Sequence, residues 1–200
     1  MTIAVTGPFA SGKSTLVRLL GELPNAETSS ADEMVHHLLK HDQQTISRVV
    51  RRFGEDVRGS DGIDRKALGR EVFGDAGALR DLEEILHPLV RDETDRRIEA
   101  SGAEVFVVEI PLLFETGREA DFDYTVAVLV PEERHRTWVG ERGIDGAALE
   151  AIESRQYTGE EKAGRADLVV HNDGDLDRLR EQAEDIGRKV SQGGYHGHLR

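Results

Sequence analysis

Apolar residues occur along this chain in short continuous runs and in longer stretches with helical spacing. The short runs predict buried strands over Thr2–Thr6, Val105–Glu109, Tyr124–Val130 and Leu168–Val170. Continuous apolar strands are typical of parallel sheets that are covered on both faces. Because these strands alternate with helical stretches, the pattern predicts an α/β fold built on an open, mostly parallel sheet.

The stretches with helical spacing predict the helices. They are expected over Lys13–Leu20, Ala31 to about Leu39, Gln43–Phe53, Arg65–Phe73, Leu79–Ala100, Glu132–Arg142, Ala147–Ser154 and Asp175–Val190. Pro88 is expected to kink or split its helix, and the Gly- and Asp-rich stretch Arg58–Asp64 predicts a turn. The helical block from Ala31 to Ala100 is long for a crossover and is expected to cap the site, whereas the tail 191–200 is expected to fray.

Composition limits the class of protein. Two hundred residues with 38% hydrophobic content suit one α/β domain, expected over residues 1–190. A net charge of −13 argues against a nucleic-acid-binding surface. No apolar run approaches the ~18 residues of a membrane span, and no secretory signal is recognisable, so a cytoplasmic location is expected. The acidic, lysine-poor composition fits either adaptation to high salt or a genomic bias.

The strongest chemical signal is the segment Gly7–Ser14, Gly-Pro-Phe-Ala-Ser-Gly-Lys-Ser, which matches G-x-x-x-x-G-K-[ST]. In such a P-loop, backbone N–H groups and the positive end of the following helix surround phosphates. Lys13 would reach the β- and γ-phosphates of ATP, and the Ser14 hydroxyl would bind Mg²⁺. A strand before the segment and a helix after it favour a P-loop over a chance match.

Asp32 is the candidate general base. A kinase must activate an acceptor hydroxyl, usually with a positioned Asp, and Asp32 begins a helix after the second expected strand. The alternative is that Ser30 and Glu33 form a capping box and Asp32 only complements the helix dipole. The local pattern alone favours the capping alternative.

Further segments match, in order, motifs of the dephospho-CoA kinase family, which the chain resembles over residues 1 to about 190. The P-loop carries the family's A-S-G-K-S as Ala10–Ser14. The other matching segments are Ser30-Ala31-Asp32 for Asp-Ala-Asp, Asp61–Leu68 for D-G-x-[LI]-D-R-x-x-L, Val72-Phe73 for V-F, Leu82–Pro88 for L-E-x-I-x-H-P, Pro111–Glu115 for P-L-L-F-E, and Ala166–Gly174 for A-D-x-V-I-x-N-x-G.

The resemblance implies a P-loop kinase fold, with a five-stranded sheet between helices, a helical substrate side (about 31–100) and a lid (about 132–165). It implies transfer of the γ-phosphate of ATP, with Mg²⁺, to the ribose 3′-hydroxyl of dephospho-CoA, the last step of coenzyme A synthesis. Asp32, Lys13 and Arg142 would be catalytic. The implied ATP-binding residues are Gly7, Ala10, Ser11, Gly12, Lys13, Ser14, Thr15 and, beside the adenine, Asn172; the implied acceptor-side residues are Asp64, Arg65, His87, Leu113 and Glu115.

Several of these residues have a second explanation. Asp64 can cap the helix that carries Arg65, and His87 can be a packed helix histidine. Glu109 and Glu115 flank the turn after a strand, where a carboxylate can reach a Mg²⁺-bound water or substrate, but a solvated strand end explains each equally well.

The chain also departs from the family pattern. Ser30 replaces the first Asp of Asp-Ala-Asp, His36 replaces an arginine, and the lid's R-x-x-x-R becomes Trp138 and Arg142. These departures leave open a related P-loop kinase with another small hydroxyl or nucleotide acceptor, or a nucleotide-binding regulatory protein. The sequence gives neither the oligomeric state nor the preference for ATP over GTP.

Overall fold

The computed structural model describes residues 1–143 and 146–192 and divides into two compact units. The sheet unit comprises residues 1–30 and the described part of 101–200, and the helical unit comprises Ala31–Ala100. The helical unit has the same bounds as the helical block expected from the sequence. Of the tail expected to fray, Ser191 and Gln192 end a helix and residues 193–200 lie outside the described part.

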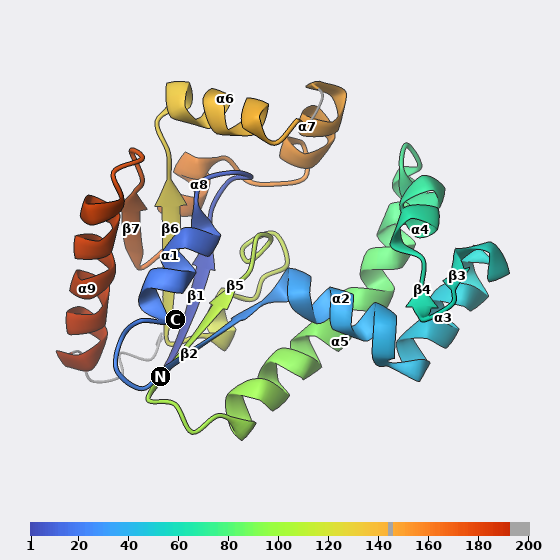
Figure 1. Ribbon diagram of the computed structural model, residues 1–200, viewed down its shortest axis with the longest axis horizontal. Helices are drawn as coiled ribbons and strands as arrows, with labels where there is room; N and C mark the ends of the chain where they lie inside the picture. Colours follow the sequence, from blue (N-terminus) through green and yellow to red (C-terminus); the bar gives the residue numbers. More distant parts are fainter. Residues whose placement is uncertain (144–145, 193–200) are drawn as a thin grey trace. The chain divides into compact units, whose positions relative to one another are not determined.

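The sheet unit contains five parallel strands in the order β2-β5-β1-β6-β7 (Figure 1). Their bounds are Thr2–Thr6 (β1), Ala26–Ser30 (β2), Val105–Glu109 (β5), Tyr124–Leu129 (β6) and Leu168–His171 (β7). In register, Val5 pairs with Glu109 and Thr6 with Ala127. The expected five-stranded, mostly parallel α/β sheet is therefore confirmed, and the carboxyl ends of β1, β5 and β6 share one edge.

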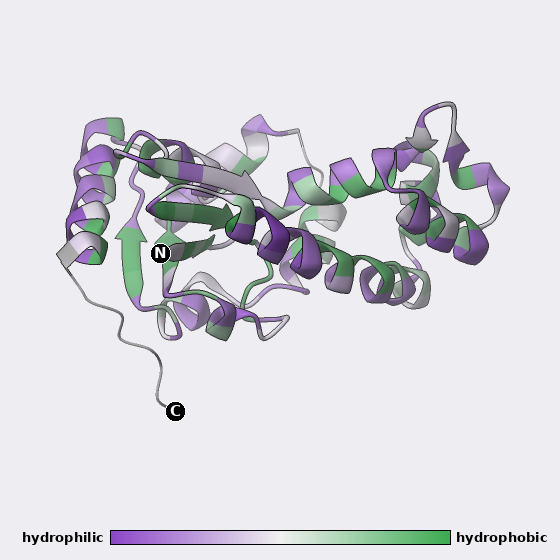
Figure 2. Ribbon diagram, turned by 90° about the horizontal axis from the view of Figure 1, so that it is seen from below, coloured by the Kyte–Doolittle hydropathy of each residue, from purple (hydrophilic) through white to green (hydrophobic). Residues whose placement is uncertain are grey.

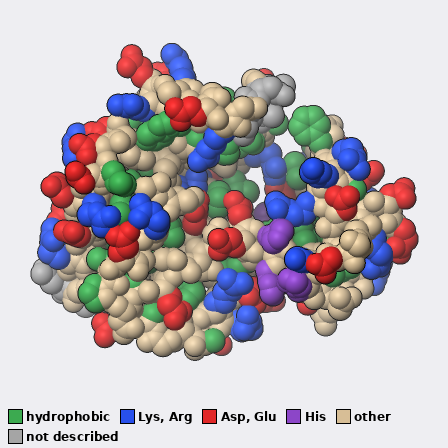
Figure 3. All heavy atoms as spheres, in the orientation of Figure 1, with side chains coloured by type: hydrophobic (Ala, Val, Ile, Leu, Met, Phe, Trp, Pro, Cys, Tyr) green, Lys and Arg blue, Asp and Glu red, His purple; other side chains and the backbone are tan. Residues whose placement is uncertain are grey.

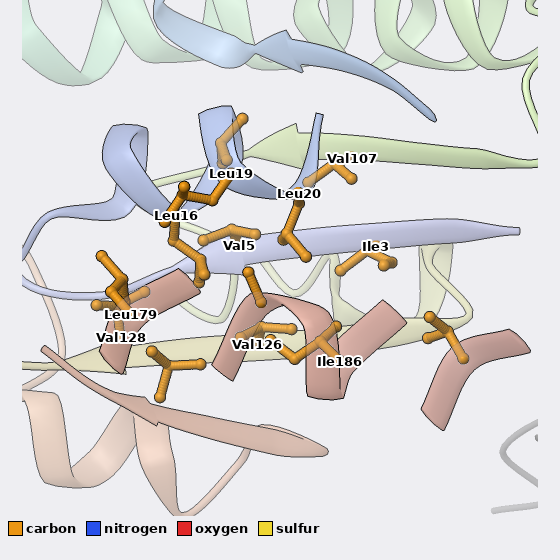
Figure 4. Packing of buried hydrophobic residues seen from close by; sticks show 14 of the residues in the cluster. Ile3, Val5, Leu16, Leu19, Leu20, Val107, Val126, Val128, Leu179 and Ile186 are labelled. Carbon is orange, nitrogen blue, oxygen red and sulfur yellow. The ribbon is translucent and has the colours of Figure 1, made fainter. Parts of the chain in front are cut away.

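The main core lies between one face of this sheet and two helices, α1 (Lys13–Leu20) and α9 (Leu176–Gln192) (Figure 4). Ile3 and Val5 on β1 pack in this cluster with Leu16 of α1 and Leu179 of α9. Successive strand side chains point to opposite faces, so Thr6 faces the other side, where its hydroxyl meets Lys162 of α8 (Gly159–Ala163). Helices thus cover both faces, and the central strands are mostly apolar (Figure 2).

The region expected to form a lid begins after β6. It comprises α6 (Glu132–Glu141), α7 (Gly146–Glu153) and α8. A short 3₁₀ helix, η2 (Glu119–Asp121), lies before β6. Helix α8 opens with a full capping box, in which Thr158 and Glu161 bond each other's backbone N–H groups. This capping box fixes where the chain turns back toward the sheet.

The helical unit has its own core, formed by α2 (Ala31–His41), α3 (Gln43–Phe53), α4 (Arg65–Val72) and α5 (Ala76–Ala100). The short elements η1 (Glu55–Val57), β3 (Arg58–Gly59) and β4 (Gly62–Ile63) connect α3 to α4, and β3 and β4 form an antiparallel pair. Gly62 has φ 92°, and a Cβ there would lie 2.6 Å from the carbonyl oxygen of Leu39, so this turn requires glycine.

Pro88 is expected from the sequence to kink or split its helix, and α5 continues through it, so the proline does not split the helix. Leu86 and Val90 are buried on either side of the proline, and this packing on both sides offsets the lost backbone hydrogen bond. Among the described helices, none is long and apolar enough to cross a bilayer.

Candidate active site

The P-loop joins β1 to α1 and adopts a backbone that favours glycine at two positions. Gly7 has φ 152° and Gly12 has φ 91°, and Ala10 also lies in the left-handed region with φ 57°. The N–H groups of Thr15 and Leu16 both donate to the carbonyl of Gly12, at 3.0 and 3.1 Å, and begin α1. The Ser11 hydroxyl is buried and, within the described residues, has no hydrogen-bond partner. The loop therefore retains an unsatisfied polar group beside a helix N-terminus, as expected of an anion site.

Asn172 braces this loop from the far end of the sheet. It follows β7 and is buried, and its Nδ2 donates to the carbonyl oxygen of Ser11 at 3.0 Å. Its Oδ1 accepts the N–H of Gly174 at 3.2 Å. A Cβ on Gly12 would lie 2.1 Å from Asn172 Nδ2, so the amide also occupies the space that any larger residue at position 12 would need.

Lys13 lies at the start of α1 and is only 7% exposed. Its Nζ donates to the carbonyl oxygen of Pro8 at 2.8 Å, so the side chain folds over the loop. An ammonium group held there carries positive charge at the centre of the predicted phosphate site.

Ser14 and Glu109 bring two oxygen ligands together. Ser14 Oγ donates to Glu109 Oε1 at 3.2 Å, linking α1 to the end of β5. Hydroxyl and carboxylate oxygens suit Mg²⁺, which usually takes one or two protein ligands plus phosphate oxygens and waters. The described residues contain no cluster of three or more His, Cys, Asp or Glu that could enclose a metal. The pair fits Mg²⁺, and Glu109 is therefore a stronger candidate than the sequence alone suggested.

Helix α6, in the region expected to form a lid, contacts the tip of the P-loop at Phe9. His135 Nε2 lies 2.7 Å from the Phe9 carbonyl oxygen, and the guanidinium of Arg142, just after the helix, lies 5.0 Å from the centre of the Phe9 ring. A cation over an aromatic face at this distance is attracted by the ring. Arg142, the predicted lid arginine, thus contacts Phe9, which occupies a position of the P-loop motif where any residue is allowed.

Trp138 and Arg134 flank the loop that carries Asn172. A Cβ on Gly174 would lie 3.4 Å from both Trp138 Cζ2 and Arg134 Nε. These two α6 side chains are therefore neighbours of the 172–174 turn, where the resemblance places the adenine.

Glu115 and Lys162 form a buried ion pair that sequence analysis did not predict. Lys162 Nζ lies 2.8 Å from Glu115 Oε1, and Lys162 has no exposed surface. Burial lowers the pKa of the Lys162 ammonium, although Glu115 opposes that effect. Charged residues in the short stretch Gly159–Ala163 have the pattern of a solvated helix, so the sequence offered no signal for this contact. Leu113, in the same turn as Glu115, is fully buried.

In the helical unit, Asp32 is exposed in the first turn of α2. Within the described residues, neither Ser30 nor Glu33 makes a side-chain hydrogen bond, so the alternative capping box is not formed. Ser30 instead ends β2, paired in register with Glu109 of β5. The chain therefore reaches Asp32 two residues after the strand end that adjoins the Ser14–Glu109 pair.

Asp64 is the N-cap of α4. Its Oδ1 accepts the N–H groups of Lys66 at 2.9 Å and Ala67 at 3.2 Å, and the hydrogen bonds from Ala67 and then Lys66 lower the pKa of this carboxyl. Arg65 Nη1 lies 3.0 Å from Nδ1 of His36, so the histidine that replaces the family's arginine contacts another arginine of the unit. Figure 3 shows histidine side chains gathered over α2, where His36 and its neighbours are exposed. His87 is exposed on α5.

Comparison with known proteins identifies relatives over nearly the whole chain. The family model described as dephospho-CoA kinase matches residues 1–178. A curated dephospho-CoA kinase of Symbiobacterium thermophilum is 40% identical over 196 residues, covering 96% of this chain and 82% of the relative.

Two solved structures are also similar to this chain over nearly its full length. A crystal structure from Thermus thermophilus superposes with a TM-score of 0.79 at 32% identity, covering 97% of this chain and 98% of that one. The dephospho-CoA kinase from Campylobacter jejuni has a TM-score of 0.69 at 26% identity, covering 96% and 98%. The similarity to these proteins therefore extends over nearly the full length of the chain.

Proposed function

This chain belongs to the dephospho-CoA kinase family, and we infer that it transfers the γ-phosphate of ATP to the ribose 3′-hydroxyl of dephospho-CoA, the last step of coenzyme A synthesis. The observation that carries this inference is the match over residues 1–178, together with a P-loop in which Lys13 and Ser14 are both present. The departures from the family's motifs at Ser30, His36 and Trp138 all lie within the matched residues.

The P-loop would hold the triphosphate. The binding residues proposed here are Gly7, Ala10, Ser11, Gly12, Lys13, Ser14 and Thr15, with Asn172 bracing the loop through Ser11. Lys13 would exchange its contact with the Pro8 carbonyl for phosphate oxygens, because the ammonium is a point charge on a flexible stem. Ser14 and Glu109 would hold Mg²⁺, which supplies charge neutralisation on the phosphates when bound.

Asp32 would accept the proton of the ribose 3′-hydroxyl as the new bond from that oxygen to the γ-phosphorus forms and the bond to the β-phosphate oxygen breaks. Its place supports this role, since it follows β2 by two residues and makes no capping contact through Ser30 or Glu33 among the described residues. Arg142 would stabilise charge on the transferring group. Asp64, Arg65, His87, Leu113 and Glu115 are proposed for the acceptor side, and the exposed groups among them are the ones available for direct contact.

The test is a coupled assay of ADP release with dephospho-CoA, compared with a panel of nucleosides, nucleotides and sugars at equal concentration. We expect turnover with dephospho-CoA and a product phosphorylated at the 3′ position of the ribose. Faster turnover with another acceptor would assign the chain to a different substrate. Nucleotide binding without transfer to any acceptor would instead identify a regulatory protein.

A further inference from the structure

Lys162 is the largest side chain of the described residues that is completely buried. Lysine is almost never buried in full unless it is paired, because its charge loses its hydration. The proposed phosphate chemistry assigns no role to this residue. A group that is costly to bury and has no role in binding substrate requires an explanation.

Its ammonium group meets three acceptors, which match the three donors of lysine. Nζ lies 2.5 Å from the Pro111 carbonyl oxygen, 2.8 Å from Glu115 Oε1 and 3.3 Å from Thr6 Oγ1. Thr6 Oγ1 itself donates to the Pro111 carbonyl at 3.2 Å. The lysine therefore lies at the centre of a network that joins three separate segments of the sheet unit.

Two of those segments carry the predicted phosphate and metal groups. Thr6 ends β1 and directly precedes Gly7, the first residue of the P-loop. Pro111 follows Glu109, the residue that accepts from Ser14, by two positions. Lys162 thus connects the ends of the same two strands that present the P-loop and the Ser14–Glu109 pair.

The third segment is the chain between α7 and α8, at the end of the predicted lid. Glu115 Oε1 accepts the N–H of Tyr157 at 2.6 Å in addition to the Lys162 ammonium. Tyr157 lies between α7 and α8, so one carboxylate oxygen attaches the chain leaving the lid to the turn after β5. Glu115 Oε2 is buried without a hydrogen-bond partner among the described residues, so the network is not optimised for stability alone.

We propose that Lys162 is a positioning residue for phosphoryl transfer: it fixes the ends of β1 and β5 and the base of the lid against one another, and thereby sets the geometry of the P-loop and of the Ser14–Glu109 pair. This proposal rests on the proposed function, because it concerns the binding of Mg²⁺ and ATP at that site. Lys162 acts through its contacts with Thr6, Pro111 and Glu115, not through contact with substrate.

The test must separate positioning from stability. Lys162→Met removes the charge but leaves Glu115 buried and unpaired, which is strongly destabilising. The double variant Lys162→Met/Glu115→Leu replaces the whole pair by apolar groups, and such replacements are often neutral for stability. Leu179→Ala, in the core between α9 and the sheet, is the control that lowers stability away from the network.

We expect the double variant to recover most of the melting temperature lost by Lys162→Met but not its function. Because a displaced outer partner of a metal site costs roughly 10- to 100-fold in affinity or activity, the concentration of Mg²⁺ that half-saturates ATP binding should rise at least several-fold. The kcat should fall to a similar degree, whereas Leu179→Ala should change the melting temperature alone. Normal kcat and normal Mg²⁺ dependence in the double variant would overturn the proposal and leave Lys162 a structural ion pair.

Calorimetric titration of each variant with ATP at several Mg²⁺ concentrations needs no acceptor. If the wild-type chain binds Mg²⁺ and ATP but does not phosphorylate dephospho-CoA, the proposed function fails on its own. The shift in Mg²⁺ dependence still decides the role of Lys162 in that case.

Discussion

The guanidinium of Arg142 lies 5.0 Å from the centre of the Phe9 ring, at the tip of the P-loop. His135 contacts the carbonyl oxygen of the same residue at 2.7 Å, so α6 and the residue after it contact both the ring and the backbone of Phe9. Although Arg142 is exposed, its guanidinium therefore has an aromatic partner. Its position depends on an aromatic side chain in the phosphate loop.

Replacing Arg142 by Ala should lower kcat by about 10²- to 10³-fold, because a cation directed at the transferring phosphate contributes most in the transition state. Phe9→Leu should cause a smaller loss, since it removes only the attraction of about 0.5–1 kcal/mol that holds the guanidinium. Steady-state kinetics with dephospho-CoA measure both effects. Arg188→Ala, which removes an exposed arginine paired with Glu184 on α9, is the control and should leave kcat unchanged.

Replacing Lys13 by Ala should reduce transfer by 10²-fold or more while the chain still folds, because the ammonium acts on the β- and γ-phosphates. Circular dichroism and the kinetic assay on one preparation measure both properties, and Lys189→Ala, an exposed lysine of α9, is the matched control. Retention of more than about a tenth of the wild-type activity would contradict the role of Lys13 in the P-loop.

Asp32→Asn distinguishes a general base from a helix-end charge. As the base, Asp32 cannot be replaced by Asn, so kcat should fall by about 10²- to 10⁴-fold with the ATP dissociation constant preserved. As a helix-end charge it would contribute only about 0.3–1 kcal/mol of stability and nothing to turnover. Glu33→Gln removes a neighbouring charge from the same helix turn and should retain full kcat. A near-normal kcat in Asp32→Asn would show that Asp32 is not the general base and only interacts with the helix dipole.

Glu93 should govern part of the acid stability of the helical unit. It lies 2.8 Å from Arg96 and 2.7 Å from Arg97, and hydrogen bonding from Arg96 is the main reason that the pKa of Glu93 falls from 4.5 to about 2. Because the folded pKa is the lower one, the stabilisation is complete above pH 4.5 and is lost as the pH falls toward about 2.

The contribution should be about 2 kcal/mol, less than the full pKa shift implies, because Arg96 is largely exposed and the pair is screened. Urea unfolding of Glu93→Gln at pH 7 and at pH 3 measures it. The variant should be less stable than wild type at pH 7, and the difference should narrow at pH 3. If the variant and wild type differ equally in free energy of unfolding at pH 7 and at pH 3, the loss of stability comes from packing and not from the charge of Glu93.

The sequence predicted those elements whose local pattern agrees with their environment. Strands β1 and β5 appeared with their observed bounds because central parallel strands are apolar on both faces. Strand β2, Ala-Glu-Thr-Ser-Ser, lies at the sheet edge with exposed Glu27 and Thr28, and hydrophobicity could not define its bounds. The P-loop was predictable because its chemistry depends on neighbours in sequence. The Lys162 network was not, because Thr6, Pro111 and Lys162 become neighbours only after folding.

The hydrogen bond between Asn172 and the Ser11 carbonyl has a consequence for how the gene for this protein can be divided. The P-loop is encoded near the start of the chain, but the amide that supports its Ser11 carbonyl is encoded 161 codons later. A fragment that ends before β7 would contain the entire motif and lack its support, so the motif is not a portable module. Grafting Gly7–Ser14 into another scaffold would require a substitute for Asn172 as well, and directed evolution at position 172 would act on phosphate binding from outside the loop.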